Sequence, residues 1–186
     1  MQGPHWIRYF HLLLLWIGLQ QVVTGQADAK FHVGIEQDVV PYATGGYFAG
    51  VWLGSGHWKT RLLHVKATKP DFLLADGFTD NVIKAYAIVL DYHLSSFSKG
   101  LWLGGGLVRW DATIRSARDG ISADYRLHLV HGSLGYHFPL RYHFYISPWA
   151  GMHFKVTGPR DVAFSAGNYR IPFLNPEASI KLGWFF

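Results

Sequence analysis

The stretch EASIKLGWFF, residues 177–186, alternates between apolar side chains and side chains that are mostly polar or small. One set comprises Ala178, Ile180, Leu182, Trp184 and Phe186, and the other begins with Glu177, Ser179, Lys181 and Gly183. Successive side chains of a β-strand point to opposite faces of the sheet. This period of two therefore predicts a strand with one apolar face and one polar face.

Two segments upstream show the same alternation. In residues 141–156 every second residue from Tyr142 to Phe154 is apolar, and the intervening set includes His143, Ser147, His153 and Lys155. In residues 99–116 the apolar set Trp102, Val108, Trp110, Ala112 and Ile114 opposes Arg109, Asp111, Thr113 and Arg115. Because these polar sets are too charged for a dry core, we predict that the apolar sets face lipid and the polar sets face a lumen.

Turn residues divide the chain after residue 29 into eight such segments. They span 30–39, 46–54, 57–68, 81–94, 99–116, 122–138, 141–156 and 173–186. Only 16% of residues are charged and 49% are hydrophobic, whereas about a quarter of a water-soluble domain is charged. We therefore predict an all-β fold, an eight-stranded antiparallel up-and-down transmembrane β-barrel that comprises residues 30–186 as one domain.

The connections between these segments alternate in length. Those near 54–56, 95–98 and 139–140 are tight, and those at 40–45, 69–80, 117–121 and 157–172 are mostly longer. This arrangement is typical of outer-membrane barrels and predicts that both termini are periplasmic. The longer loops carry apolar residues such as Phe164 and Tyr169, which either mark a partner surface or fold over the barrel mouth.

Two segments interrupt the simple pattern. In the third, Lys59 and Arg61 share their face with Leu63 and Val65. In the sixth, the polar residues Asp124, Arg126 and His128 share their face with Leu134 and Tyr136. We predict a bulge or snorkelling side chains in the third segment, and a bulge near His131 or Gly132 in the sixth.

Residues 1–29 have the pattern of a secretory signal peptide, with Arg8 before an apolar run at 12–19 and small residues after it. Cleavage is predicted after Gly25 or Ala29. The chain has no cysteine, which excludes disulfides, a zinc–thiolate site, a thiol nucleophile and a lipoprotein anchor. Its net charge of +5 is dispersed along the strands, so we predict no nucleic-acid partner.

The end of the chain resembles the C-terminal assembly signal of Gram-negative outer-membrane barrels, which has a final Phe preceded by alternating apolar residues. Ile180, Leu182, Trp184 and Phe186 match that pattern. Together with the signal peptide and the eight segments, the chain is similar to small outer-membrane barrels of the OmpX/OmpW-like class, including Bacteroidetes-type families. The resemblance implies an outer-membrane location, assembly by the barrel assembly machinery, and contact with membrane lipid and lipopolysaccharide.

The predicted lumen carries charges of both signs, which we expect to neutralise one another in a narrow barrel. The predicted network comprises Glu36, Asp38, Asp91, Arg109, Asp111, Arg115, Asp124, Arg126, His128, Glu177 and Lys181. A charge-filled lumen favours a non-enzymatic protein that serves envelope integrity, surface binding or limited passage of small solutes. The sequence predicts neither a metal site nor a cofactor, since no His-x-His pair lines a strand face.

Two alternatives remain open at this level. His131 and Ser133 share one strand face and Glu177 could orient the histidine, a partial resemblance to barrel lipid A 3-O-deacylases. This set would make the protein an enzyme acting on lipid A or phospholipid. The second alternative is a soluble periplasmic lipocalin-like barrel with an apolar interior, a charged exterior and an apolar ligand.

Overall fold

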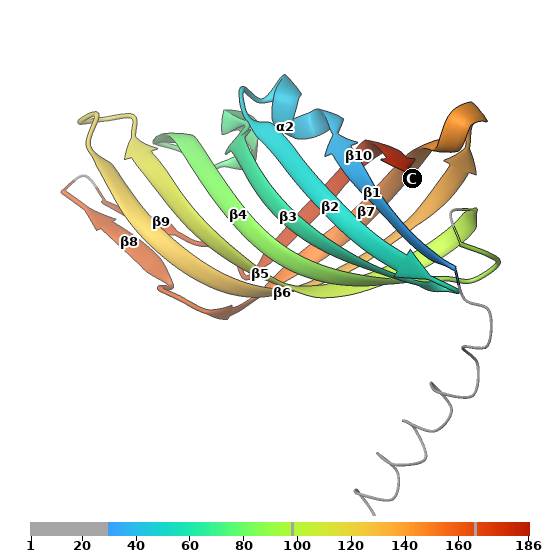
Figure 1. Cartoon of the computed structure of the whole chain (residues 1–186). Coiled ribbons are helices and arrows are strands. Elements are labelled where there is room, and N and C mark those ends of the chain that lie inside the picture. Colours follow the sequence, from blue (N-terminus) through green and yellow to red (C-terminus); the bar gives the residue numbers. More distant parts are fainter. Residues whose placement is uncertain (1–29, 98, 166) are drawn as a thin grey trace, which may run out of the picture. The chain divides into compact units, whose positions relative to one another are not determined.

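A computed structural model describes residues 30–97, 99–165 and 167–186; the predicted signal peptide lies outside these residues. Eight antiparallel strands form a closed barrel in the order β1-β10-β7-β6-β5-β4-β3-β2 (Figure 1), which confirms the predicted fold. The strands are β1 (Phe31–Asp38), β2 (Tyr47–Ser55), β3 (Trp58–Lys69), β4 (Phe78–His93), β5 (Gly100–Ser116), β6 (Ser122–Pro139), β7 (Phe144–Thr157) and β10 (Leu174–Phe185).

Five smaller elements lie in the connections. Helix α2 (Val39–Ala43) begins after β1, where the side chain of Asp38 accepts a hydrogen bond from the Val40 backbone N–H. Two 3-10 turns are η1 (Asp71–Leu73) and η2 (Arg141–His143). Strands β8 (Asp161–Phe164) and β9 (Gly167–Arg170) pair as a separate hairpin between β7 and β10. No helix in the described part of the chain is long and apolar enough to cross a membrane.

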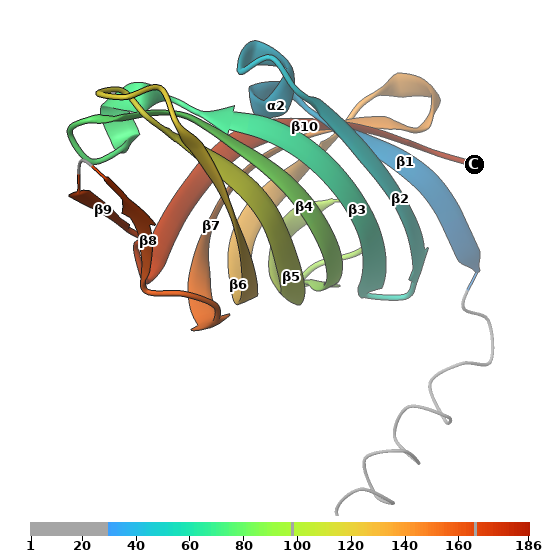
Figure 2. The same cartoon turned by 90° about the vertical axis from the view of Figure 1, so that its left-hand side faces the viewer.

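The barrel has two unlike ends. One, the short-turn end, carries the start of β1, the end of β10 and the connections β2–β3, β4–β5 and β6–β7. The other, the long-loop end, carries α2, η1, the β5–β6 loop and the β8–β9 hairpin. Strands β4, β5 and β6 have 16, 17 and 18 residues, whereas β1 and β2 have 8 and 9, so the wall is taller on the β4–β6 side (Figure 2).

The bulge predicted near His131 is wrong, and β3 shows neither the bulge nor the snorkelling predicted as alternatives there. Strand β3 pairs with β2 and β4 without a register shift, and Lys59, Arg61, Leu63 and Val65 all point inward. Strand β6 pairs with β5 continuously from Ser122 to His137, and its pairing with β7 shifts instead between His128 and Leu129. The inward and outward alternation is continuous in both strands. On a given face, the side chains change from polar to apolar along the strand.

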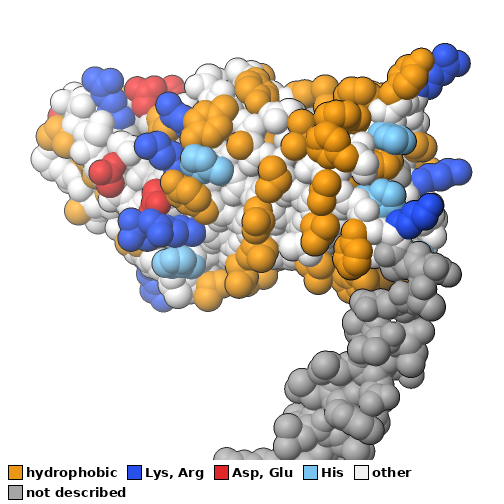
Figure 3. Space-filling model, in the orientation of Figure 1, with side chains coloured by type: hydrophobic (Ala, Val, Ile, Leu, Met, Phe, Trp, Pro, Cys, Tyr) orange, Lys and Arg blue, Asp and Glu red, His pale blue; other side chains and the backbone are white. Residues whose placement is uncertain are grey.

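This change of polarity divides the β3–β6 wall into a short-turn half and a long-loop half. The boundary in β5 lies between Leu107 and Arg109 on the outer face. In the short-turn half the outer face is apolar, and Leu101, Leu103, Leu107, Val130 and Leu134 are all exposed. In the long-loop half the outer face carries Arg109, Asp111, Asp124 and Arg126, and Figure 3 shows charged side chains of both signs gathered toward that end.

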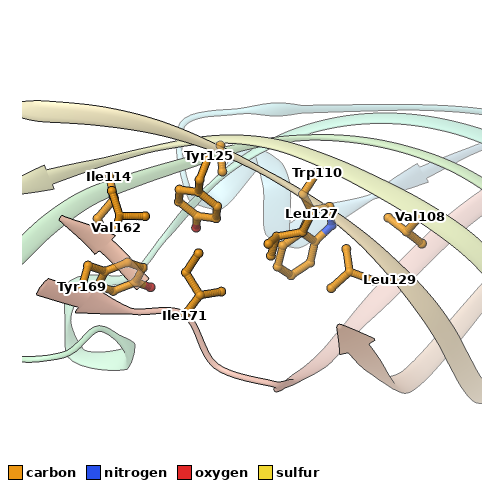
Figure 4. Packing of buried hydrophobic residues seen from close by; sticks show 10 residues of the cluster. Val108, Trp110, Ile114, Tyr125, Leu127, Leu129, Val162, Tyr169 and Ile171 are labelled. Atoms are coloured by element: carbon orange, nitrogen blue, oxygen red, sulfur yellow. The ribbon is translucent and has the colours of Figure 1, made fainter. Parts of the chain in front are cut away.

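The interior reverses this arrangement. Inside the long-loop half lies an apolar core to which the β8–β9 hairpin and the residue that follows it contribute Val162, Tyr169 and Ile171 (Figure 4). These residues pack against inward side chains of β5 and β6, including Ile114 and Leu127, which have no exposed surface. The apolar residues of loop 157–172 therefore fold into the barrel mouth, one of the two roles that the sequence left open.

Candidate functional site

The interior of the short-turn half holds a buried ion network built by β1, β3 and β4. Lys59 Nζ donates to Glu36 Oε1 at 2.5 Å, and the Arg61 guanidinium contacts Asp91 at 2.7 Å (Nε–Oδ2) and 2.8 Å (Nη2–Oδ1). A longer contact of 3.8 Å joins Arg61 to Glu36. All four side chains are at most 2% exposed. The two-point contact of Arg61 with Asp91 is the strongest arrangement for such a pair.

Tyr145 on β7 connects this network to the opposite wall. Its hydroxyl donates to Glu36 Oε1 at 2.7 Å and accepts from Lys59 Nζ at 3.0 Å. Gly183, inward-facing on the neighbouring strand β10, leaves the space that the Tyr145 ring fills, because a Cβ there would collide with the ring. The network therefore spans the lumen from wall to wall.

Two further charges complete the set. Lys181 on β10 is 2% exposed and lies over the rings of Trp149 and Trp102, at 4.2 and 4.9 Å from their centroids. Asp38 accepts hydrogen bonds from Trp149 Nε1 at 2.8 Å and from Ser179 Oγ. Glu36, Asp38 and Asp91 balance Lys59, Arg61 and Lys181, so the formal charge of the set is zero. Such neutrality is what a buried group of ions requires.

Aromatic rings fill the lumen between this network and the short-turn end. Phe97, from the β4–β5 turn, stacks on His32 with centroids 5.0 Å apart and lies 5.5 Å from Trp52. His137 lies 4.8 Å from His93 and 4.5 Å from Tyr145, centroid to centroid. His93 and His137 are both buried. The ion network and these rings therefore lie next to one another in the interior of the short-turn half.

A second polar cluster lies around a cavity of about 120 Å³ on the long-loop side of the network. His153 Nε2 is 2.8 Å from Glu177 Oε2, and its ring centroid is 4.5 Å from that of His131. Apolar residues of β2 to β5, including Phe48, Val65 and Val89, form another part of the lining. The cavity is thus polar toward β6, β7 and β10 and, apart from Arg61 on β3, apolar toward β2 to β5.

The predicted catalytic set is not assembled in this cluster. His131, Ser133 and Glu177 all point inward, but Glu177 pairs with His153 rather than with His131. Ser133 Oγ is buried and has no hydrogen-bond partner among the described residues. Without a base bonded to its hydroxyl, Ser133 lacks the activation that a serine nucleophile needs.

Six of the predicted lumen residues lie instead on the outer surface of the long-loop half. They are Arg109, Asp111, Arg115, Asp124, Arg126 and His128. These residues do share one face of their strands, as predicted. That face is the outer one, because Trp110, Ile114 and Leu127 on the opposite face fill the apolar core. Glu36, Asp38, Asp91, Glu177 and Lys181 do point into the barrel.

Several interior polar residues lie outside the predicted network. Lys59 and Arg61 are two of them, and their spacing of two places both on the face opposite the exposed Leu62. Ser147 and His153 belong to the predicted polar face of residues 141–156 but not to the predicted network, and Tyr145 is a further interior residue of β7. The sequence signal for Lys59 and Arg61 is that two cations lie together at the short-turn end of β3. In the ring order β3 is two strands from β1, which carries Glu36, and three strands from β10, which carries Lys181.

Comparisons with known proteins bear on the fold. The chain matches no protein-family model and no curated protein sequence. Neisserial surface protein A is a similar structure, 9% identical, with a TM-score of 0.53 over 85% of this chain and 96% of that one. The N-terminal β-barrel domain of Pseudomonas aeruginosa OprF is 10% identical, with a TM-score of 0.49 over 86% and 100%. The likeness to Neisserial surface protein A supports the barrel fold, and membership of the OmpX/OmpW-like class stays a prediction.

Proposed function

We propose that this chain is an outer-membrane protein whose short-turn half crosses the membrane and whose long-loop half extends beyond it. The support is the outer apolar face, which runs in β6 from Val130 to Phe138, close to the roughly 9–11 residues that a tilted transmembrane strand needs. The charged outer face beyond Leu107 then lies in water or among lipid headgroups. Long loops at that end favour a surface location, with both termini in the periplasm.

The function that this geometry supports best is that of a closed, non-enzymatic barrel for envelope integrity or surface binding. The observation that carries it is the neutral network of Glu36, Lys59, Arg61, Asp91 and their partners, which together with Phe97 fills the short-turn half. Interiors of barrels with eight strands are narrow enough to be filled by side chains. We therefore favour a membrane scaffold over a route for solutes.

Two measurements test this proposal on the purified full-length protein. The unboiled protein should migrate differently from the boiled protein on a gel, and it should fractionate with the outer membrane. In planar bilayers it should show no stable conductance steps. A soluble protein whose mobility ignores heating would contradict the membrane location, and reproducible single-channel steps would contradict the closed lumen.

The enzymatic alternative gains no support from the site. A lipid in the membrane meets the outer face of the barrel, whereas His131 and Ser133 point into its interior. Lipid A from cells with and without the protein should therefore show the same acyl pattern by mass spectrometry. Loss of an acyl chain that depends on Ser133 would restore that alternative.

A further inference from the structure

The outer surface of β2 to β7 changes character over three consecutive rows of paired residues. The first row is apolar and joins Val51, Leu62, Ile88, Leu107, Val130 and Phe154. The second joins Ala49, His64, Tyr86, Arg109 and His128. The third joins Tyr47, Lys66, Lys84, Asp111 and Arg126. Passing from hydrocarbon toward water, the surface is therefore apolar, then aromatic and basic, then strongly charged.

An open groove of about 750 Å³ crosses the first two rows. Its floor is apolar and includes Val51, Leu62, Ile88 and Leu107, and its lining also includes His64, Tyr86, Arg109 and His128. The groove is thus continuous with the apolar outer face of the barrel and ends at Arg109. Lys84 and Arg126 line a recess of about 400 Å³ in the next row, which Asp111 joins to Arg109. An acyl chain fits such a floor, and a charged headgroup fits such an end.

The cationic side chains are held in place by their neighbours. Asp111 accepts from Arg109 Nη2 at 2.8 Å and from Arg126 Nε at 2.5 Å, so one carboxylate holds two guanidinium groups together. Arg109 also lies over the ring of Tyr86. The Tyr86 ring in turn stacks on His64, its other neighbour in the row, with centroids 4.6 Å apart. The two arginines remain 44% and 60% exposed, and a guanidinium has five N–H donors, more than Asp111 can accept.

Charge complementarity decides the class of ligand. The second and third rows contain Lys66, Lys84, Arg109 and Arg126 against the single carboxylate of Asp111, an excess of three positive charges. Asp124 in the next row reduces this excess to two. Paired guanidinium forks match the oxygen atoms of phosphate and carboxylate groups, and phosphate is the usual anionic group of membrane lipids. Several cations side by side suit a headgroup with more than one phosphate.

From these observations we propose that the groove is a binding site for a phosphorylated glycolipid of the lipid A type. Its phosphates lie against Arg109, Arg126 and Lys84, and an acyl chain lies over Leu107 and Ile88. This inference rests on the proposed membrane location and orientation, which place the charged rows at the outer-leaflet headgroups. The sequence resemblance implies a contact with lipopolysaccharide, and the proposed site places that contact on the outer surface of the barrel.

Native mass spectrometry of the detergent-solubilised full-length protein tests the site. We expect bis-phosphorylated lipid A to bind at least about tenfold more tightly than its dephosphorylated form, since charge-assisted hydrogen bonds are lost with the phosphates. Phosphatidylglycerol should bind with intermediate affinity, and phosphatidylcholine weakly. Equal binding of all four lipids would overturn the proposal.

Variants test whether lipid A binding depends on these two arginines or only on the positive charge of the protein. The double variant Arg109→Ala/Arg126→Ala should lower lipid A affinity about tenfold or more. The matched control Arg141→Ala/Arg160→Ala removes the same charge from exposed positions outside the rows and should leave affinity within about twofold. Arg109→Lys/Arg126→Lys keeps the charge but not the forks and should fall between them.

The outcomes distinguish this inference from the proposed function. Heat-dependent gel mobility of each variant reports whether the barrel folds, and both arginines are exposed, so it should be unchanged. A folded, membrane-located protein whose arginine variant binds lipid A as well as the control would overturn the site alone. A protein that never reaches the membrane would overturn the proposed function.

Discussion

The two halves of the β3–β6 wall use the same strands with opposite placement of polar and apolar side chains. In the short-turn half the interior holds Lys59, Arg61 and Asp91 and the exterior holds Leu62, Ile88 and Leu107. In the long-loop half the interior holds Ile114 and Leu127 and the exterior holds charged residues. In the proposed orientation lipid surrounds the first half and water surrounds the second, and the interior of each half has the opposite polarity to its surroundings.

Removing a charge from the polar interior should have the largest effect. Arg61→Ala leaves Asp91 buried without its partner, and we expect it to lower the free energy of unfolding by about 3–5 kcal/mol. Urea titration in detergent micelles, followed by tryptophan fluorescence, measures this. Arg109→Ala on the outer surface removes the same side chain and should have a much smaller effect. Equal destabilisation by the two variants would contradict the distinction between inside and outside.

Truncating the apolar interior should have the next largest effect. Leu127→Ala opens a cavity beneath the β8–β9 hairpin and should lower the free energy of unfolding by about 2–4 kcal/mol. Because the hairpin packs on this core, limited proteolysis should also cut residues 158–173 faster. Leu103→Ala, an exposed leucine on the outer face of the same sheet, is the matched control and should leave proteolysis unchanged.

A smaller effect is expected from the hydrogen bonds that fasten the hairpin to the wall. Buried Asn81 on β4 accepts from the Tyr125 hydroxyl at 3.0 Å and donates to the Tyr169 hydroxyl at 3.3 Å. Asn81→Ala leaves both hydroxyls without this partner and should lower stability by about 2 kcal/mol, against about 1 kcal/mol for Tyr125→Phe. Urea titration of both variants checks the order, and a reversed order would contradict the bridging role of Asn81.

The smallest effect concerns acid. Asp119 accepts from Ser165 Oγ at 2.7 Å and from the Ile121 backbone N–H at 3.1 Å, and these bonds lower the pKa of its carboxyl below the usual 3.8. Because its pKa is lowered, the ionised carboxyl of Asp119 stabilises the folded loop above pH 4. The loop loses this stabilisation as the pH falls through the pKa of the folded state. Proteolysis of the hairpin should therefore accelerate slightly near pH 3. Asp119→Asn should abolish this pH dependence, and an undiminished acceleration in that variant would exclude Asp119 as its cause.

Much of the fold could be predicted from alternation alone. The predicted segments 99–116 and 122–138 match β5, which runs from Gly100 to Ser116, and β6, which runs from Ser122 to Pro139. A period of two defines the two faces of a strand without saying which one is inside. In β5 the wrong face was chosen for Arg109 and Asp111, because the strand is tall enough to leave the apolar belt and its exterior becomes polar.

The candidate site was less accessible to prediction. Glu36 and Lys181 were placed in the lumen from their own strands, but the pairing of Glu36 with Lys59 depends on which strands face each other across the interior. Likewise, Glu177 was assigned to His131 by residue type, while the closed ring brings it to His153. The hairpin β8–β9 was missed because two strands of four residues each carry too little alternation to be recognised.

The neutral ion network also bears on how the barrel closes. Strands β1 and β10 pair only over Gly34 to Asp38, whereas β5 and β6 pair from Gly100 to Arg115. This short seam joins the two ends of the sheet, and closing it carries the largest loop entropy in the molecule. Glu36 and Asp38 stand on the inner face of the seam and are bonded to β3, β7 and β10. We therefore expect the pairing of β1 with β10 to be the last step of folding. The bonds of Glu36 and Asp38 to β3, β7 and β10 then hold the closed seam together from the inside.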